Sequence, residues 1–523
     1  MGFEEVRIAI LNTVIIASLC GGLSLAFGTL ISIFLVRTNI YGRTFAWLAV
    51  STQLAVPLYV FAGGWSASFG LQGWIRPIAN SFNVALLEGQ AGTWSALFAV
   101  AIVHALGAVP WVMLVVTAGL LRIDRNQEEQ AMIDGGILQT IRFSILPSLR
   151  PWLAAASMIA IVPVFTEMVV SNLFQVSTVT ELVYLDSSRG TVTPLTYFVA
   201  IFLCILPILL AVALLWRQLP SWQHMSHRSI HYQPNLIELG RMRWVWSLLA
   251  WSLISLLVGL PMASLVVKAG WQPFTDADGS TAYSWTLDRA LTTAQESFTL
   301  FVPEFKWTIL LGVSSCTTAL GIAGLIRVLI FSISRASSAG EGETKSWIES
   351  IVHVLMLILI ATPGPLVGMV IIWILNRSTP SLFGYLYDQT LTAPVLAQQF
   401  RLLPIAWFLT VVAKSTISRE SREQASLDGL SLFQFLRDVA WPQTRSLWGF
   451  STVLLMILSI GELSCTILVL PPGVTTLAMR LFEMLHFGMR HQDSGLCGLL
   501  VFCGWFAAGA LWLASGWKTR NDR

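Results

Sequence analysis

Long apolar stretches constrain the fold of this chain more than any other feature of its sequence. A helix needs about 20 mostly apolar residues to cross a bilayer. The stretches that meet this requirement are residues 8–36, 45–66, 94–121, 152–174, 195–216, 244–267, 307–333, 351–375, 392–413, 447–470 and 496–517. The ninth is the weakest, because Arg401 interrupts it. Since these stretches are far longer than the roughly 10 alternating residues of a barrel strand, we expect an all-α polytopic membrane protein with about 11 transmembrane helices and no strands.

Composition excludes several other classes of protein. Of the 523 residues, 55% are hydrophobic and 11% are charged, whereas an ordinary soluble domain is roughly 25% charged. A cytosolic enzyme, a secreted disulfide scaffold and a disordered protein are therefore excluded. The net charge of +3 is spread over short loops, which argues against a nucleic-acid partner. The six cysteines lie in or beside apolar stretches without a CxxC spacing, so we expect packing residues and no metal site.

The distribution of basic residues predicts the orientation of the chain. Lys and Arg are retained on the cytoplasmic side of a membrane protein. With the N-terminus outside, 20 of the 31 Lys and Arg residues lie in cytoplasmic segments, nine lie outside, and Arg327 and Arg401 lie within spans. We therefore expect an external N-terminus and a cytoplasmic C-terminus. The longest external stretch is then the acidic loop 270–304. Arg327 and Arg401 are expected to snorkel or to be paired in the interior.

An internal repeat divides the chain into two halves. Residues 129–135 (Glu-Gln-Ala-Met-Ile-Asp-Gly) recur as residues 423–429 (Glu-Gln-Ala-Ser-Leu-Asp-Gly), an offset of 294. Beyond these heptads the offset is 295, and it pairs Pro147 with Pro442, Glu167 with Glu462 and Thr180 with Thr475. Because six predicted spans separate equivalent positions, the copies have the same orientation and form two parallel repeats. We place the first half at residues 1–243 and the second at residues 244–523.

Both heptads lie in cytoplasmic loops, residues 122–150 and 414–445, that are too patterned for plain connectors. In the first, residues 127–134 are expected to form a short helix, Gly135 and Gly136 a sharp turn, and residues 137–146 a second helix that Pro147 stops. The second loop repeats this pattern around Gly429 and Pro442. A short helix pair on the cytoplasmic face of a membrane domain offers a rigid knob to a soluble partner.

The pattern E-Q-A-x-x-D-G, followed 12 or 13 residues later by Pro, resembles the "EAA" coupling loop of ABC importer permeases. In that family the pattern E-A-A-x-x-x-G recognises the ATPase. Gln130 and Gln424 depart from its first Ala. The resemblance implies that the residues that couple to the ATPase are Glu129, Ala131, Asp134, Gly135, Pro147, Glu423, Ala425, Asp428, Gly429 and Pro442.

This resemblance also implies a fold, partners and a location. The fold is the type I ABC importer permease fold (MetI-like), in a bacterial inner (plasma) membrane. The implied partners are an ABC ATPase dimer, an extracytoplasmic solute-binding protein and the lipid bilayer. ATP is used by the partner subunit, and this chain needs no cofactor. It also carries no nucleophile–base constellation and no Walker lysine, so we expect a transport subunit and not an enzyme.

A narrower pattern concerns the transported substrate. Residues 12–13, 37–43, 57–60 and 69–70 resemble the fused permeases of ferric-iron importers, which implies ferric iron as the cargo. Thiamine, phosphonate and polyamine importers are related alternatives. Each half of such permeases usually begins with an extra helix. Here the second half has it at residues 244–267, ahead of Thr308, whereas the first half begins almost at Asn12. The expected number of spans is therefore eleven and not twelve.

Glu167 and Glu462 are candidate residues of the translocation path. Each lies 15 residues after the start of its predicted span, hence about 22 Å along a helix that crosses roughly 30 Å of hydrocarbon. A carboxylate at that depth tends to face a bundle interior or a water-filled path. We expect the pair to face each other between the halves, the alternative being a purely structural role. An ion-driven secondary carrier is a second hypothesis, but it leaves the repeated cytoplasmic heptads unexplained.

Overall fold

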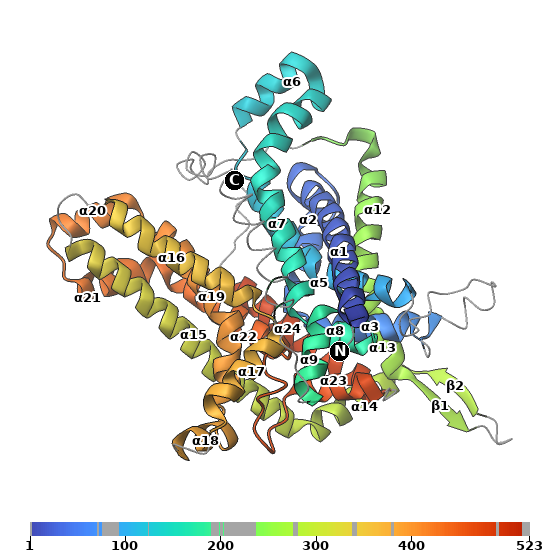
Figure 1. Ribbon diagram of the computed structural model, residues 1–523. Coiled ribbons are helices and arrows are strands. Elements are labelled where there is room, and N and C mark those ends of the chain that lie inside the picture. The colour runs from blue at the N-terminus through green and yellow to red at the C-terminus, as the bar shows by residue number, and fades with distance from the viewer. Residues whose placement is uncertain are drawn as a thin grey trace. The chain divides into compact units, whose positions relative to one another are not determined.

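The computed structural model describes residues 3–70, 73–75, 94–123, 125–189, 198, 202, 237–275, 281–336, 342–377, 381–487 and 491–514, which are almost entirely helical. The chain forms two compact units. The first comprises Met1–Leu300 and Leu481–Val501, and the second comprises Phe301–Arg480 and Phe502–Arg523. Each unit has its own core of spanning helices (Figure 1).

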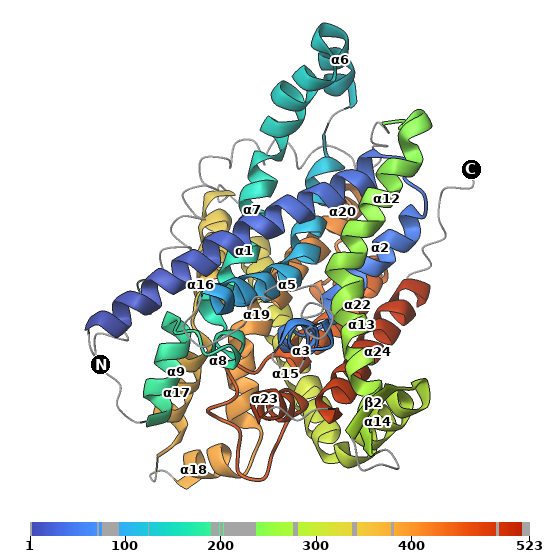
Figure 2. The same cartoon turned by 90° about the vertical axis from the view of Figure 1, so that its right-hand side faces the viewer.

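The core of the first unit is built from three long helices, α1 (Phe3–Arg37), α5 (Trp94–Leu120) and α7 (Leu146–Thr166) (Figure 2). Small residues let them approach closely, as in other membrane helix packings. A Cβ at Gly28 of α1 would collide with Val112 of α5. At the same level the Ser32 hydroxyl donates to the Met113 carbonyl over 2.9 Å. These contacts hold α1 and α5 side by side along much of their length.

Two further groups of helices complete the first unit. Helix α2 (Arg43–Thr52) runs into the 3-10 turn η1 (Gln53–Ala55) and meets α3 (Leu58–Phe69) at a bend of 107°. The next span is continuous from η3 (Gly240–Met242) through α12 (Arg243–Ile254), the π turn η4 (Ser255–Gly259) and α13 (Leu260–Gly270).

The second of these groups lies after the predicted half boundary at residues 243 and 244, yet it packs within the first unit. The backbone N–H of Tyr41 donates to the Ser247 hydroxyl at 2.9 Å, and the Ser68 hydroxyl donates to Ser264 at 2.6 Å. The compact units therefore do not follow the predicted halves. The boundary at 243/244 stays a prediction about the sequence repeat.

The two ends of the first unit carry different small elements (Figures 1 and 2). At one end stands α6 (Arg125–Gln139). At the other lie α8 (Val169–Leu173), α9 (Val179–Arg189), the hairpin of β1 (Trp271–Thr275) and β2 (Thr281–Trp285), and α14 (Leu287–Leu300). The hairpin corrects the expectation that no strands occur. Its aromatic residues lie in the long loop 270–304 between apolar stretches, where strand pairing satisfies the backbone.

The second unit repeats the same order of elements. Its spanning helices are α15 (Val302–Ala336), the pair α16 (Gly342–Ala361) and α17 (Gly364–Leu375), α19 (Thr392–Thr416) and α22 (Trp441–Gly461). The short helix α18 (Ser381–Asp388) follows α17. Helices α23 (Leu477–Phe487) and α24 (Gln492–Ala514) are divided between the units, because Leu481–Val501 belongs to the first. The pair α16 and α17 is bent by 101° at Pro363. Ala319, Leu402, Ala406 and Leu455 are fully buried where α15, α19 and α22 meet.

Three helices of the first sequence half have counterparts of equal length in the second, although α5 has 27 residues and its counterpart α19 has 25. Helices α1 and α15 have 35 residues each, α7 and α22 have 21, and α9 and α23 have 11. The π turns η2 (Thr140–Ile145) and η5 (Phe435–Ala440) have six each. One tertiary bond is also matched, because the hydroxyl of Thr13 accepts the first N–H of α9 and that of Thr308 accepts the first N–H of α23.

Nine of the predicted stretches correspond to candidate spans in the described part of the chain. Seven are single helices, including the ninth, 392–413, and the second and eighth are the bent pairs. Helix α24 covers most of the eleventh stretch. The fifth, 195–216, lies outside the described residues. The full count of eleven therefore stays a prediction.

The fourth and tenth stretches differ from the prediction at both ends. The predicted spans 152–174 and 447–470 end earlier, at Thr166 and Gly461, and the continuous helices begin earlier, at Thr140 and at Leu432. Pro147 and Pro442 do not stop the preceding short helices, because each lies in the first turn of α7 or α22. A π turn directly before a proline accommodates the missing N–H, so the short helix and the span run on as one rod.

Candidate functional site

The second coupling loop, residues 414–445, is a short helix, a turn and a return helix. Helix α20 (Arg419–Leu427) begins at Ser418, whose hydroxyl accepts the N–H of Ser421 at 3.0 Å. It ends at Gly429, which has φ +66°. The N–H groups of Gly429 and Leu430 donate to the carbonyls of Ser426 and Ala425. These two bonds are the pattern that a glycine in left-handed conformation closes at a helix C-terminus.

A second cap then starts the return helix. The Ser431 hydroxyl accepts the N–H of Gln434, and the Gln434 side chain accepts the N–H of Ser431 at 2.9 Å. This reciprocal capping box begins α21 (Leu432–Gln434), which continues through η5 into α22. The turn is therefore fixed by its own backbone and capping bonds, and it lies directly before a spanning helix.

The first coupling loop, residues 122–150, makes its turn at the second of the two glycines predicted to form it, Gly135 and Gly136. Within α6 the helical conformation breaks at Gly136, with φ +73° and ψ −172°. Gly135 is helical, and a Cβ there would meet the flexible end of the Gln139 side chain. A backbone at that φ and ψ is open almost only to glycine. Gly136, and not Gly135, is therefore the conformational counterpart of Gly429.

The predicted coupling residues lie mostly on the surface of these loops. Glu129, Asp134, Gly135, Glu423, Asp428, Gly429 and Pro442 are exposed, Ala131 and Pro147 are half-buried, and Ala425 is buried. Ala425 packs with Ile417, Phe435 and Ala440 beneath the second turn. Because Ala425 is small, α20 can pack closely against the rest of its loop, while the acidic residues of the motif are exposed.

Among the described residues, the two most exposed large apolar side chains lie on these loops, which the sequence motif did not reveal. Ile133 is 84% exposed and Leu427 is 86% exposed. They occupy the same place in the two heptads, two residues before the predicted glycine. Phe143 and Phe433 are also exposed on the return helices. Large apolar side chains projecting from a fixed turn are what a pocket on a partner protein would bind.

The first coupling loop is held to α1 by a buried ion pair. Both guanidinium Nη atoms of Arg37 reach the Glu128 carboxylate, at 2.8 and 2.7 Å. The same guanidinium donates to the Leu120 carbonyl at the end of α5 over 2.9 Å. The two side chains are 5% and 6% exposed. The pair joins the last residue of α1, the end of α5 and the start of α6.

The second coupling loop is held to α15 by aromatic packing. The ring of Phe331 stacks on the ring of Phe435, with centroids 5.3 Å apart and planes 9° apart. Around them Leu430, Leu436 and Val439 pack against the buried cluster of Ile417, Ala425 and Ala440. At the position that matches Glu128, this loop has Arg422. The two loops thus share a turn but differ in the chemistry that holds it.

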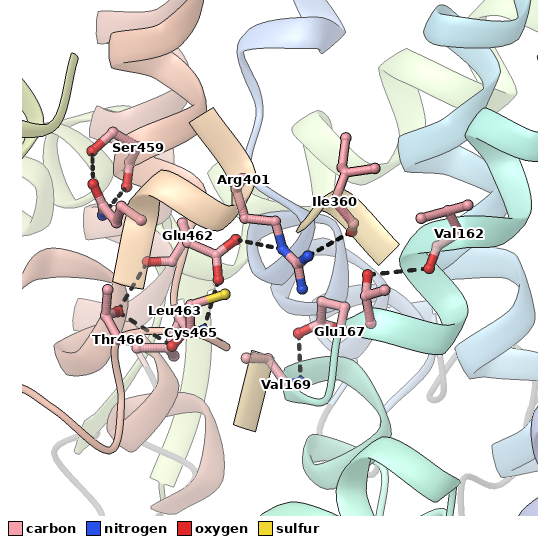
Figure 3. Close-up of polar contacts among 12 residues, drawn as sticks. Val162, Glu167, Val169, Ile360, Arg401, Ser459, Glu462, Leu463, Cys465 and Thr466 are labelled. Carbon is pink, nitrogen blue, oxygen red and sulfur yellow. Dashed lines mark hydrogen bonds and ion pairs between the residues drawn. The ribbon is translucent and has the colours of Figure 1, made fainter. Parts of the chain in front are cut away.

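Glu167 ends α7 and does not lie within a helix, which corrects the prediction. Its backbone is extended, with φ −106° and ψ 135°. Its carboxylate accepts the N–H of Val169 at 2.5 Å and that of Val170 at 3.2 Å, at the start of α8 (Figure 3). The Nε2 atom of His104 on α5 lies 3.9 Å from the carboxylate. Glu167 therefore fixes a change of direction at the end of a span.

Glu462 has the same place at the end of α22, with φ −88° and ψ 115°. Its carboxylate accepts the N–H of Cys465 at 2.8 Å (Figure 3). Arg401 on α19 places Nε 3.7 Å from the carboxylate and donates from Nη1 to the Ile360 carbonyl at 2.6 Å. That carbonyl belongs to the last turn of α16, where helix carbonyls have no helical partner. The arginine that interrupts the ninth stretch is therefore paired in the interior.

Arg327 is paired in the same way within the second unit. Its Nη1 atom lies 2.7 Å from Glu349, which also accepts from Lys414 at 2.7 Å. Its guanidinium stacks over the Trp407 ring at 4.2 Å. The expectation that Arg327 and Arg401 are interior-paired is confirmed. In the described part of the chain no group of three or more His, Cys, Asp or Glu side chains could hold a metal ion.

Fold and site together define a helical membrane protein in which one spanning helix of each unit continues into a structured loop. Residues 335–515 match the family model of the binding-protein-dependent transport system inner membrane component. The matched stretch includes the second coupling loop, α22 and Glu462, so this part of the chain is similar to the membrane components of such transport systems. Comparison with curated proteins and with solved structures found no match.

Proposed function

We propose that this chain is the permease of an ABC importer and that both coupling loops dock an ATPase subunit. The observation that carries the proposal is the shared design of the loops. Each presents a highly exposed apolar side chain, Ile133 or Leu427, two or three residues before a glycine with positive φ. Each loop continues into a spanning helix without interruption. A displacement of the loop by a partner would therefore be transmitted to the membrane helix.

The two halves are proposed to be fused copies of one permease subunit, with one ATPase bound to each. The family match covers only the second copy. The equal helix lengths and the matched hydroxyl caps of Thr13 and Thr308 support the assignment of the first copy. ATP would be bound and hydrolysed by the partner, and a solute-binding protein would deliver the cargo on the opposite face.

The proposed orientation places both coupling loops and the C-terminus in the cytoplasm and the N-terminus outside, in a bacterial inner membrane. Reporter fusions or cysteine labelling in intact cells would test it. A cysteine at Glu129 should react only after the membrane is permeabilised. Labelling of that cysteine by an impermeant reagent added outside would contradict the orientation.

Ferric iron is proposed as the cargo, on the resemblance of residues 12–13, 37–43, 57–60 and 69–70 to iron-type permeases. Thiamine, phosphonate and polyamine remain the alternatives.

Glu167 and Glu462 are proposed to line the translocation path, because each places a carboxylate where a spanning helix ends and the backbone turns. Replacing both with Gln should change the uptake rate while the ATPase stays bound. Normal uptake by this double variant would leave the pair a structural role.

Substitution of Ile133 and Leu427, the apolar tips of the two loops, tests the docking proposal. Ile133→Glu and Leu427→Glu should each weaken binding of the ATPase subunit by about tenfold or more, since 1.4 kcal/mol of lost contact corresponds to that factor. Both positions are exposed, so the amount of folded permease should not change. The controls Ile133→Leu and Leu427→Ile keep an apolar tip and should bind normally. Full ATPase retention by the double Glu variant would contradict the proposal. A secondary carrier would show no dependence on an ATPase in any variant.

A further inference from the structure

Helix α14 lies across the membrane end of the first unit and is held there by its small residues. The Thr293 hydroxyl donates to the Ala269 carbonyl at the end of α13 over 3.2 Å. The Ser297 hydroxyl donates to the Gln492 carbonyl at the start of α24 over 3.3 Å. Gly495 of α24 permits the approach, because a Cβ there would meet Thr293 and Ser297. The buried face of α14 therefore rests on the ends of two membrane helices.

The large apolar residues of α14 point away from this contact. Leu287 is 58% exposed and Leu291 is 62% exposed, although Ala290, Thr293 and Ser297 are buried. At 100° per residue Leu287 and Leu291 lie within about 40° of one another on the helix. Asp288, Thr292 and Glu296 occupy a separate exposed face. The helix thus has three faces, one packed, one apolar and exposed, and one polar and exposed.

The neighbouring residues show at which level of the membrane the apolar face lies. Trp271 and Trp285 are directly paired across the hairpin that precedes α14, and both are partly exposed. The Trp285 indole N–H donates to the Val266 carbonyl in the last turns of α13 over 3.4 Å. Lys268 and Asp493 form an ion pair of 2.8 Å at the same level. Exposed Trp side chains and a charged pair at the ends of spans are typical of the boundary between lipid and water.

We propose that α14 is an interfacial anchor whose apolar face, Leu287 and Leu291, is inserted into the bilayer at the boundary of headgroups and acyl chains. Val266 on α13, whose carbonyl accepts the Trp285 indole N–H, also has an exposed side chain. The polar face with Asp288 and Glu296 then remains in water. An amphipathic helix of this kind inserts its apolar face about 5–10 Å into the boundary region. The anchor fixes the tilt of α13 and the depth of the hairpin, and it does so whatever the chain transports.

The test places an environment-sensitive fluorescent amino acid at Leu291 in the full-length protein, in phosphatidylcholine and phosphatidylglycerol vesicles. The matched control carries the same amino acid at Thr292, which is exposed on the polar face. A nitroxide on carbon 5 of the acyl chain should quench position 291 at least about threefold more than position 292, and aqueous iodide should show the reverse order.

Two results would overturn the proposal. Equal quenching by iodide at both positions would place the apolar face in water. Protection of position 291 from both quenchers would show that a protein covers it, either a second copy of this chain or a soluble partner. Both positions are exposed in the folded unit, so each label can be introduced without disturbing the core.

Discussion

In the first unit the coupling loop is joined to its membrane helix by the buried pair of Arg37 and Glu128, whereas in the second unit the ring of Phe331 stacks on Phe435. Beyond the heptads the offset of 295 places Thr140 of the first unit at the position of Phe435. Both loops nevertheless present an exposed apolar side chain close to a glycine with positive φ. Both units thus preserve the position of the loop on its spanning helix, although different chemistry holds it.

This difference predicts how the stability of each loop responds to substitutions. A buried ion pair requires both partners, because removing one leaves an uncompensated charge away from water. An aromatic stack loses stability in proportion to the buried area that is removed. The first loop should therefore lose much of its stability when one partner of the ion pair is replaced, and regain it when both are replaced. The second loop should lose stability gradually as more of the aromatic ring is removed.

The largest expected effect is that of Glu128→Ala. It leaves the Arg37 guanidinium buried without its carboxylate, which costs about 3–5 kcal/mol. Hydrogen exchange in the backbone of α6 should become much faster, while α20 should be unaffected. The double variant Arg37→Met with Glu128→Leu should restore most of the protection, since an apolar pair of similar volume often replaces a buried ion pair. Unchanged exchange in the single variant would mean that the pair does not hold the loop.

The matching change in the second unit is Phe435→Ala, with an expected cost of about 3 kcal/mol for a buried ring. Faster hydrogen exchange should appear in α20 and η5, and Phe435→Leu should have a smaller effect because it keeps most of the apolar volume. The control Phe433→Ala removes an exposed ring and should leave exchange within experimental error. Equal effects of the two alanine variants would contradict an aromatic anchor.

Smaller effects are expected from substitutions at the turn glycines of the two loops. Gly136→Ala should destabilise the first loop by about 1–3 kcal/mol, because its φ and ψ are open almost only to glycine. Gly135→Ala, in helical backbone, should be neutral or slightly stabilising. Gly429→Asn should be tolerated, since Asn adopts the left-handed helix cap, whereas Gly136→Asn should not. Thermal unfolding and ATPase binding would measure both. Equal tolerance of alanine at residues 135 and 136 would contradict the assignment of the turn to Gly136.

Some features of the fold and site could be predicted from the sequence because they depend on local pattern. Apolar length located nine candidate spans, and the repeated heptads located two loops that each contain a glycine turn. The ends of α7 and α22 could not be located, because the apolar stretches continue past Glu167 and Glu462 and the carboxylates cap the following turn. The role of Glu128 was also hidden, since a Glu-Glu pair gives no sign that one side chain is buried against the distant Arg37. The packing of α12 to α14 in the first unit depends on tertiary contacts alone.

The central claim is that both loops dock an ATPase through their apolar tips. The most direct measurement is site-specific photo-crosslinking from Ile133 and Leu427 in membranes that contain the ATPase subunit, with crosslinkers at Trp94 and Trp373, both exposed on spanning helices, as controls. We expect a crosslink to the ATPase from both tips, and none from either control. Crosslinks from only one tip would contradict paired docking, and their absence from both would contradict the assignment of the loops.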